Sequence, residues 1–140
     1  LVGSEMCIRD RITEVAGASQ VFDCGICSYA NQIKERVLGV SHETLEALGA
    51  VSRETAAQMA AGVRKLAQAD IGVSTTGIAG PDGGTDEKPV GLVYVGVDSE
   101  NYSTVLECRL SRGYRDEREL IRYLASSHAL RLALTAARKA

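Results

Sequence analysis

Residues 74–84 read STTGIAGPDGG, and four of these eleven residues are glycine. The stretch follows an apolar segment at residues 71–73 and leads to a second apolar segment that begins at Leu92. Glycine lets a ligand approach backbone N–H groups without meeting a Cβ atom, so this density of glycines after a strand is typical of an anion-binding loop. The other interpretation of the same glycines is a long turn that joins two strands.

Spacing excludes two familiar glycine-rich phosphate loops. The sequence contains no G-x-x-x-x-G-K-[ST] motif, and the residues after the loop predict a strand where a dinucleotide-binding fold has a helix. The stretch is therefore another kind of loop that binds phosphate or carboxylate, or it is only a turn.

Helix and strand patterns alternate on both sides of this stretch. Ser41 and Ser52 are typical N-caps, and Gly39 and Gly49 are typical helix stops. Helices are predicted at residues 12–16, 31–38, 43–48, after Ser52 and at 115–138, and strands at 21–29, at 71–73, at 92–97 and at 103–110. This order predicts an α/β fold, a three-layer α/β/α sandwich on a mixed, mostly parallel sheet.

Composition restricts the function classes. The chain has 140 residues, is 45% hydrophobic and carries a net charge of −2, which is typical of one globular domain and gives no electrostatic case for binding nucleic acid or an anionic membrane. No run of about eighteen apolar residues predicts a membrane span. The N-terminus lacks the basic and apolar regions of a signal peptide, so we expect a cytoplasmic protein.

The cysteines Cys24 and Cys27 form a C-x-x-C motif, which could be half of a zinc site or a redox pair. The sequence contains no second such pair, and His42 is the only histidine nearby. Positions i and i+3 of a strand face opposite sides of a sheet, so the motif favours a structural role. A redox protein remains a weaker alternative.

Residues 76–84, TGIAGPDGG, followed by KPVG at 88–91, resemble the central signature of the CinA C-terminal domain family, the nicotinamide-nucleotide amidases. The resemblance runs from about Ile12 to the C-terminus and includes a Tyr-x-Asn-x-x-Lys segment that ends at Lys34. It implies an α/β/α architecture, hydrolysis of nicotinamide mononucleotide to nicotinate mononucleotide and ammonia, no metal or organic cofactor, and a homo-oligomer, most simply a dimer.

The resemblance also implies a site. Lys34 would take the proton of a serine nucleophile, as in the Ser-Lys variant of the catalytic triad, and Tyr29 would hydrogen-bond the lysine or the serine. Without the resemblance, Lys34 is a surface lysine and Tyr29 a core aromatic residue. The predicted substrate-binding residues are Thr76, Gly77, Ala79, Gly80, Asn31 and Arg115. Three other arginines, Arg112, Arg118 and Arg122, are interpreted as solvated, and His128 as a core histidine.

The first eleven residues do not fit the family pattern. At the corresponding positions, the family has a strand that ends in Ala-Glu-Ser-Cys-Thr-Gly-Gly. These eleven residues resemble a translated sequencing adapter, so we expect a non-native segment at 1–11 and an incomplete domain at 12–140. Gapless counting places Val2 at the position of the nucleophilic serine, and Ser4 is the alternative as a displaced nucleophile. We therefore expect a sheet without its central first strand and an inactive copy; the alternative is a non-catalytic nucleotide-binding or dimerisation module.

Overall fold

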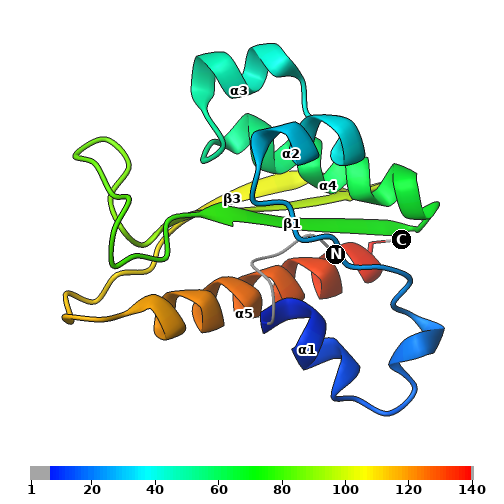
Figure 1. The fold of residues 1–140 in the computed structure, drawn as a ribbon. Coiled ribbons are helices and arrows are strands. Elements are labelled where there is room, and N and C mark those ends of the chain that lie inside the picture. Colours follow the sequence, from blue (N-terminus) through cyan, green and yellow to red (C-terminus); the bar gives the residue numbers. More distant parts are fainter. Residues whose placement is uncertain (1–6, 140) are drawn as a thin grey trace.

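A three-stranded antiparallel sheet with helices on both faces forms the centre of the fold (Figure 1). The computed structural model describes residues 7–139. Its strands, in spatial order, are β1 (Ile71–Gly77), β2 (Leu92–Ser99) and β3 (Thr104–Arg109). Its helices are α1 (Cys7–Thr13), the 3-10 helix η1 (Ala18–Gln20), α2 (Asn31–Leu38), α3 (His42–Leu48), α4 (Arg53–Ala67) and α5 (Arg118–Ala137). Helices α2, α3 and α4 lie on one side of the sheet, and α1 and α5 on the other.

The central strand is β2, as its apolar sequence predicts. In register, Val95 of β2 lies opposite Thr75 of β1 and Leu106 of β3. Val95 is fully buried, because helices cover both faces of the strand. The predicted edge position of β3 is also confirmed.

The prediction of a mostly parallel sheet is wrong for the described strands. The loops at residues 78–91 and 100–103 return the chain directly beside the strand it has just left, so both pairings are antiparallel. The predicted strand at 21–29 is not formed either; only Ile26 makes an isolated bridge. A strand requires a ladder of backbone hydrogen bonds to a neighbour, and this segment has none beyond that bridge in the described part of the chain. In the described sheet, β1 therefore pairs only with β2.

Small residues bring α4 close to the sheet. A Cβ atom added to Gly96 of β2 would lie 2.6 Å from the carbonyl oxygen of Ala56 on α4. The hydroxyl of Ser74 on β1 donates to the same carbonyl oxygen over 2.6 Å. A second core cluster joins α4 to α2 and α3 and contains Leu38, Val40, Leu45, Met59 and Val63.

The predicted caps of α3 and α4 are confirmed: the hydroxyls of Ser41 and Ser52 accept from backbone N–H groups three residues later. Helix α5 begins at Arg118 instead of the predicted residue 115. The reason is the buried carboxylate of Glu117, which accepts from the Ser111 hydroxyl and holds the preceding residues in a loop.

Part of the segment predicted to be non-native is helical. Residues 7–11 belong to α1, where Ile8 is only 2% exposed and packs in the core with α5. The guanidinium of Arg11 donates to the hydroxyls of Ser126 and Ser127 over 2.9 and 2.8 Å. The domain boundary after residue 11 stays a prediction. Among the described helices, none is both long and apolar enough to span a bilayer.

Candidate functional site

Lys34 lies on α2 and is 5% exposed. Ala30, the residue before α2, is extended, and the carbonyls of the two residues before it reach the amine. Nζ of Lys34 donates to the carbonyl oxygens of Ser28 over 2.7 Å and Tyr29 over 3.1 Å. Burial lowers the pKa of Lys34, and negative charge on Cys27 partly opposes this shift. A positioned amine with a lowered pKa is the form in which lysine acts as a base.

A cavity of about 240 Å³ adjoins Lys34. The residues before α2, the turn before α4, the end of β1 and the first turns of α5 form its wall. Five of the predicted site residues line it, namely Lys34, Tyr29, Thr76, Gly77 and Ala79. The fold therefore brings the Tyr-x-Asn-x-x-Lys segment and the start of the glycine-rich stretch to one place, although more than forty residues separate Lys34 from Thr76 in the sequence.

Three predicted residues lie outside this lining. Asn31 is exposed at the first position of α2, and Arg115 is exposed in the loop before α5. Gly80 follows the lining residues, and its carbonyl accepts from the Arg118 guanidinium over 3.0 Å. Val2 and Ser4, the two positions considered for the nucleophile, lie outside the described residues.

Thr76 and Gly77 both have packing roles. The hydroxyl of Thr76, which is 8% exposed, donates to the carbonyl of Ala50 over 2.6 Å and retains lone pairs that could accept from a ligand. A Cβ atom added to Gly77 would lie 2.6 Å from the side chain of Val93 on β2. The close pairing of β1 with β2 therefore explains the glycine at position 77, and no ligand is needed to account for it.

The loop at residues 78–91 continues the β1–β2 hairpin. The N–H of Ile78 donates to the carbonyl of Leu92 over 2.9 Å, and the N–H of Gly91 donates to the carbonyl of Ile78 over 2.7 Å. Nζ of Lys88 ties the loop to the carbonyl of Leu48 at the end of α3. The interpretation of the stretch as a connection between strands is confirmed, and an anion-binding role for its N–H groups stays a prediction.

Arg118 and Arg122 line the cavity, although the sequence interpretation placed them in solvent. They are four residues apart in the first turns of α5, and this spacing puts both on one face of the helix. The spacing was visible in the sequence, but the face that α5 turns toward the cavity was not. Both guanidinium groups are positively charged, Lys34 adds a third positive charge only while it is protonated, and the described lining contains no aspartate or glutamate. The cavity is therefore suited to an anion.

Ser28 is a further polar residue of the lining that the sequence did not indicate. Its Oγ atom is buried and has no hydrogen-bond partner among the described residues. Unpaired buried hydroxyls are uncommon in folded proteins, and each one calls for an explanation.

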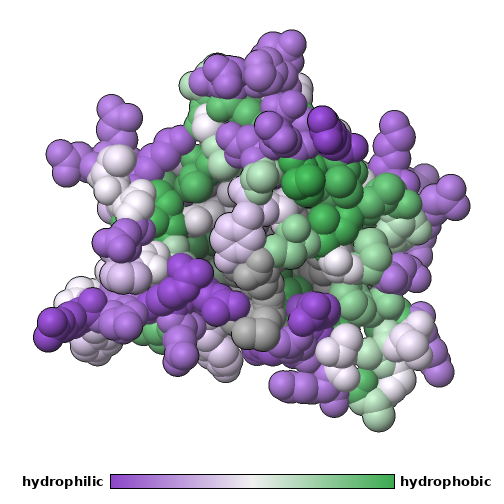
Figure 2. Space-filling model, viewed as in Figure 1, coloured by the Kyte–Doolittle hydropathy of each residue, from purple (hydrophilic) through white to green (hydrophobic). Residues whose placement is uncertain are grey.

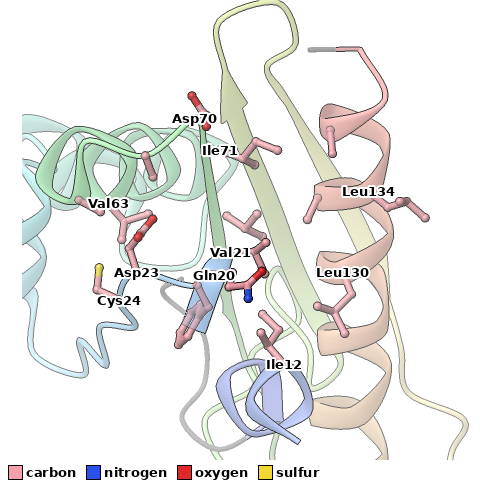
Figure 3. Close-up of a pocket in the computed structure, with 16 residues that line it drawn as sticks. Ile12, Gln20, Val21, Asp23, Cys24, Val63, Asp70, Ile71, Leu130 and Leu134 are labelled. Carbon is pink, nitrogen blue, oxygen red and sulfur yellow. The ribbon is translucent and has the colours of Figure 1, made fainter. Parts of the chain in front are cut away.

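A second, larger cavity of about 510 Å³ runs along the outer edge of β1 (Figure 3). Its walls come from the segment at residues 20–24 and from α4, β1 and α5, and they are mainly apolar, with Val63, Ile71 and Leu130 among them. Figure 2 shows the molecule from the same side as Figure 1. Hydrophobic residues gather on the right of this view, where Figure 1 places the end of α4 and the segment after α1.

The two cysteines of the C-x-x-C motif line different cavities. Cys24 belongs to the larger cavity and Cys27 to the smaller one. This separation fits the predicted opposite directions of positions i and i+3, although the segment is not a regular strand. Across residues 7–139 we find no group of three or more His, Cys, Asp or Glu side chains arranged to hold a metal ion.

Comparisons with known proteins find relatives of this chain. The family model described as CinA C-terminal domain matches residues 7–137. A competence-damage inducible protein of Thermoanaerobacter pseudethanolicus is 52% identical over 134 residues, which are 93% of this chain and 32% of that protein. A CinA-like protein of Desulfovibrio desulfuricans is 52% identical over 123 residues, 88% of this chain and 29% of that protein. The chain thus spans about a third of the length of these relatives.

Solved structures show the same fold. The competence/damage inducible protein CihA from Agrobacterium tumefaciens matches with a TM-score of 0.90 and 40% identity, over 96% of this chain and 82% of that one. The competence damage-inducible protein A from Klebsiella pneumoniae matches with a TM-score of 0.85 and 27% identity, over 94% and 81% of the two chains.

Proposed function

This chain belongs to the CinA C-terminal domain family, and on that premise we propose that its domain is built to hydrolyse the carboxamide of nicotinamide mononucleotide. The products are nicotinate mononucleotide and ammonia. One observation carries the proposal: Lys34, Tyr29 and Thr76, which the family resemblance implicates, line a single cavity.

Amide hydrolysis needs a nucleophile, a base, donors for the oxyanion and a grip on the rest of the substrate. Lys34 supplies the base, because its buried amine has a lowered pKa and is oriented by two carbonyl acceptors. It would take the proton of a hydroxyl nucleophile and return it to the departing ammonia. Tyr29, at the exposed side of the cavity, would orient the reacting groups through its hydroxyl.

We assign the grip on the substrate phosphate to Arg118 and Arg122. A guanidinium group forms two-pronged hydrogen bonds with phosphate, and both side chains line the cavity. Arg115, which the sequence suggested for this contact, lies outside the lining. The excess of positive charge in the lining supports a phosphorylated substrate over a neutral amide.

Binding of the nucleotide can be measured by isothermal titration calorimetry with nicotinamide mononucleotide. We expect Arg122→Ala to weaken binding by about ten-fold or more, because a hydrogen bond to a charged group is lost. Arg115→Ala is the matched control and should change the affinity little. The proposal fails if the unaltered chain does not bind the nucleotide, or if the two variants bind equally.

We assign no serine nucleophile among the described residues that line the cavity. Gapless counting puts Val2 where the family has its serine, so we propose that this chain binds the nucleotide but hydrolyses it negligibly. The test is ammonia release from nicotinamide mononucleotide, which should not exceed a buffer blank. Release that disappears on Lys34→Ala would show that the chain has a working nucleophile.

A non-catalytic nucleotide-binding or dimerisation module is the second candidate. One observation favours it: Ser28 is the only serine in the described lining, and its hydroxyl is buried. The genomic DNA upstream of Ile12 separates the candidates. If it encodes Glu-Ser-Cys-Thr-Gly-Gly, the natural product is the enzyme; if it encodes the present eleven residues, the module is favoured.

A further inference from the structure

Cys27 is exposed and belongs to the lining of the Lys34 cavity. Cys27 and Lys34 belong to the same cavity lining, and negative charge on the sulfur would raise the pKa of the lysine. A thiolate, not a thiol, is the nucleophilic form of cysteine, and neighbouring cations favour it.

The surroundings also attract anions. Arg118 and Arg122 stand in the same lining as Cys27 and Lys34, and the described lining contains no carboxylate. A concave site with charge of one sign raises the local concentration of small ions of the opposite sign. An anionic reagent should therefore reach Cys27 more readily than a neutral reagent of the same size.

The hydroxyl of Ser28 is an independent sign that the cavity accepts a polar ligand. Its buried Oγ has no partner among the described residues, and the residue lines the cavity directly beside Cys27. Because this Oγ atom is buried, a carboxylate in the cavity would give it an acceptor only after the Ser28 side chain turned toward the cavity.

We propose that Cys27 is a covalent modification site for small electrophiles that carry a carboxylate and enter the Lys34 cavity. The sulfur attacks the carbon that bears the leaving group, a carbon–sulfur bond forms, and the leaving group departs with its electron pair. The thiol proton passes to solvent before the attack. The reaction requires no nucleotide and no amidase activity, so it is independent of the function proposed above.

Cys24 supplies the internal reference, because it lies three residues away but lines the larger cavity, whose described lining contains Asp23 and Asp70 and no lysine or arginine. In a Cys24→Ser chain, modification of the tryptic peptide 12–34 reports Cys27; in a Cys27→Ser chain it reports Cys24. Each chain is treated with iodoacetate and, separately, with neutral iodoacetamide, and the peptide is followed by mass spectrometry. The ratio of the two rates cancels simple differences in exposure.

We expect the iodoacetate-to-iodoacetamide rate ratio to be roughly ten-fold higher at Cys27 than at Cys24. In denaturant the two ratios should become equal, because the cavity is gone. A ratio at Cys27 equal to or below that at Cys24 in the folded chain would overturn the proposal.

Two cavity variants identify the source of the effect. Lys34→Met and Arg122→Gln should each lower the ratio at Cys27 several-fold. Lys34→Met removes the trypsin site at residue 34, so in that chain the reporting peptide is 12–36. If Lys34→Met disturbs folding, Arg122→Gln alone provides the test. Lys65→Met, at an exposed position of α4 outside the cavity, should leave the ratio unchanged. The proposal also fails if both cavity variants behave like the Lys65 variant.

Discussion

At the scale of single residues, Glu117 determines where α5 begins and so where Arg118 and Arg122 stand. Its carboxylate accepts from the Ser111 hydroxyl over 2.5 Å and from the backbone N–H of Arg112. The hydrogen bond from Ser111, followed by those from backbone N–H groups, holds the pKa of Glu117 below its ordinary value. One carboxylate therefore closes the loop that precedes the arginine pair.

Replacing Glu117 with glutamine should lower stability in a pH-dependent way. Because the folded-state pKa is below the unfolded one, the carboxylate stabilises the fold above the unfolded pKa, and this contribution is lost as the pH falls through the folded pKa. Urea unfolding should show a clear loss in Glu117→Gln at about pH 7 that shrinks toward about pH 3. Glu119→Gln, an exposed neighbour on α5, is the control. An equal loss at both pH values would contradict the prediction.

Thr76 ties the end of β1 to the turn before α4. Thr76→Val keeps the side-chain volume but leaves the Ala50 carbonyl without its hydroxyl donor, which should cost about 1–2 kcal/mol of unfolding free energy. Thr104→Val, at the half-buried start of β3, should change stability by less than about 0.5 kcal/mol. Chemical denaturation measures both. If both variants lose the same unfolding free energy, the Thr76 hydrogen bond does not contribute to stability as predicted.

At the scale of elements, the contact between α4 and the sheet depends on glycine. The Cβ of Gly96→Ala would meet the Ala56 carbonyl oxygen at 2.6 Å and the Ser74 hydroxyl at 2.7 Å, and a backbone atom cannot move aside alone. We expect a loss of about 2–3 kcal/mol in urea unfolding. Lys65→Ala on the exposed side of α4 should lie within about 0.5 kcal/mol of the unaltered chain. If Gly96→Ala does not change the unfolding free energy, α4 can shift away from the sheet and the prediction is wrong.

At the scale of the whole molecule, the outer edge of β1 has no strand partner in the described sheet. The strand pairs on one side with β2, and beside its other edge lies the apolar cavity of about 510 Å³. Unpaired strand edges beside apolar walls promote association with other chains. This is the structural basis on which we propose self-association.

Leu134→Lys tests association through this edge. Leu134 lines the larger cavity and is 51% exposed, so a charge there should reduce association. Leu66→Lys is the matched control, because Leu66 is 54% exposed but lies outside the lining. Sedimentation velocity over a wide range of protein concentration should show self-association that only Leu134→Lys weakens. A monomer at every concentration, or equal effects of the two variants, would exclude this edge as the interface.

Local patterns in the sequence determined the elements whose signals are short-range. The Ser41 and Ser52 caps, the Gly39 stop of α2 and the apolar run of β2 each act within a few residues, and all were predicted correctly. The segment at 21–29 was not, because its apolar run resembles a strand but a strand forms only where a neighbour supplies hydrogen bonds.

The residues of the candidate site also fall into two groups: those that the sequence indicated and those that only the tertiary structure located. The sequence by itself determined which residue types are present and, through the family resemblance, singled out Lys34, Tyr29 and Thr76. Only the tertiary structure decided that Arg118 and Arg122, and not Arg115, line the cavity with them. The physical reason is that the Glu117 carboxylate and the packing of α5 on the sheet set the start and rotation of that helix, and both depend on contacts between segments far apart in the chain.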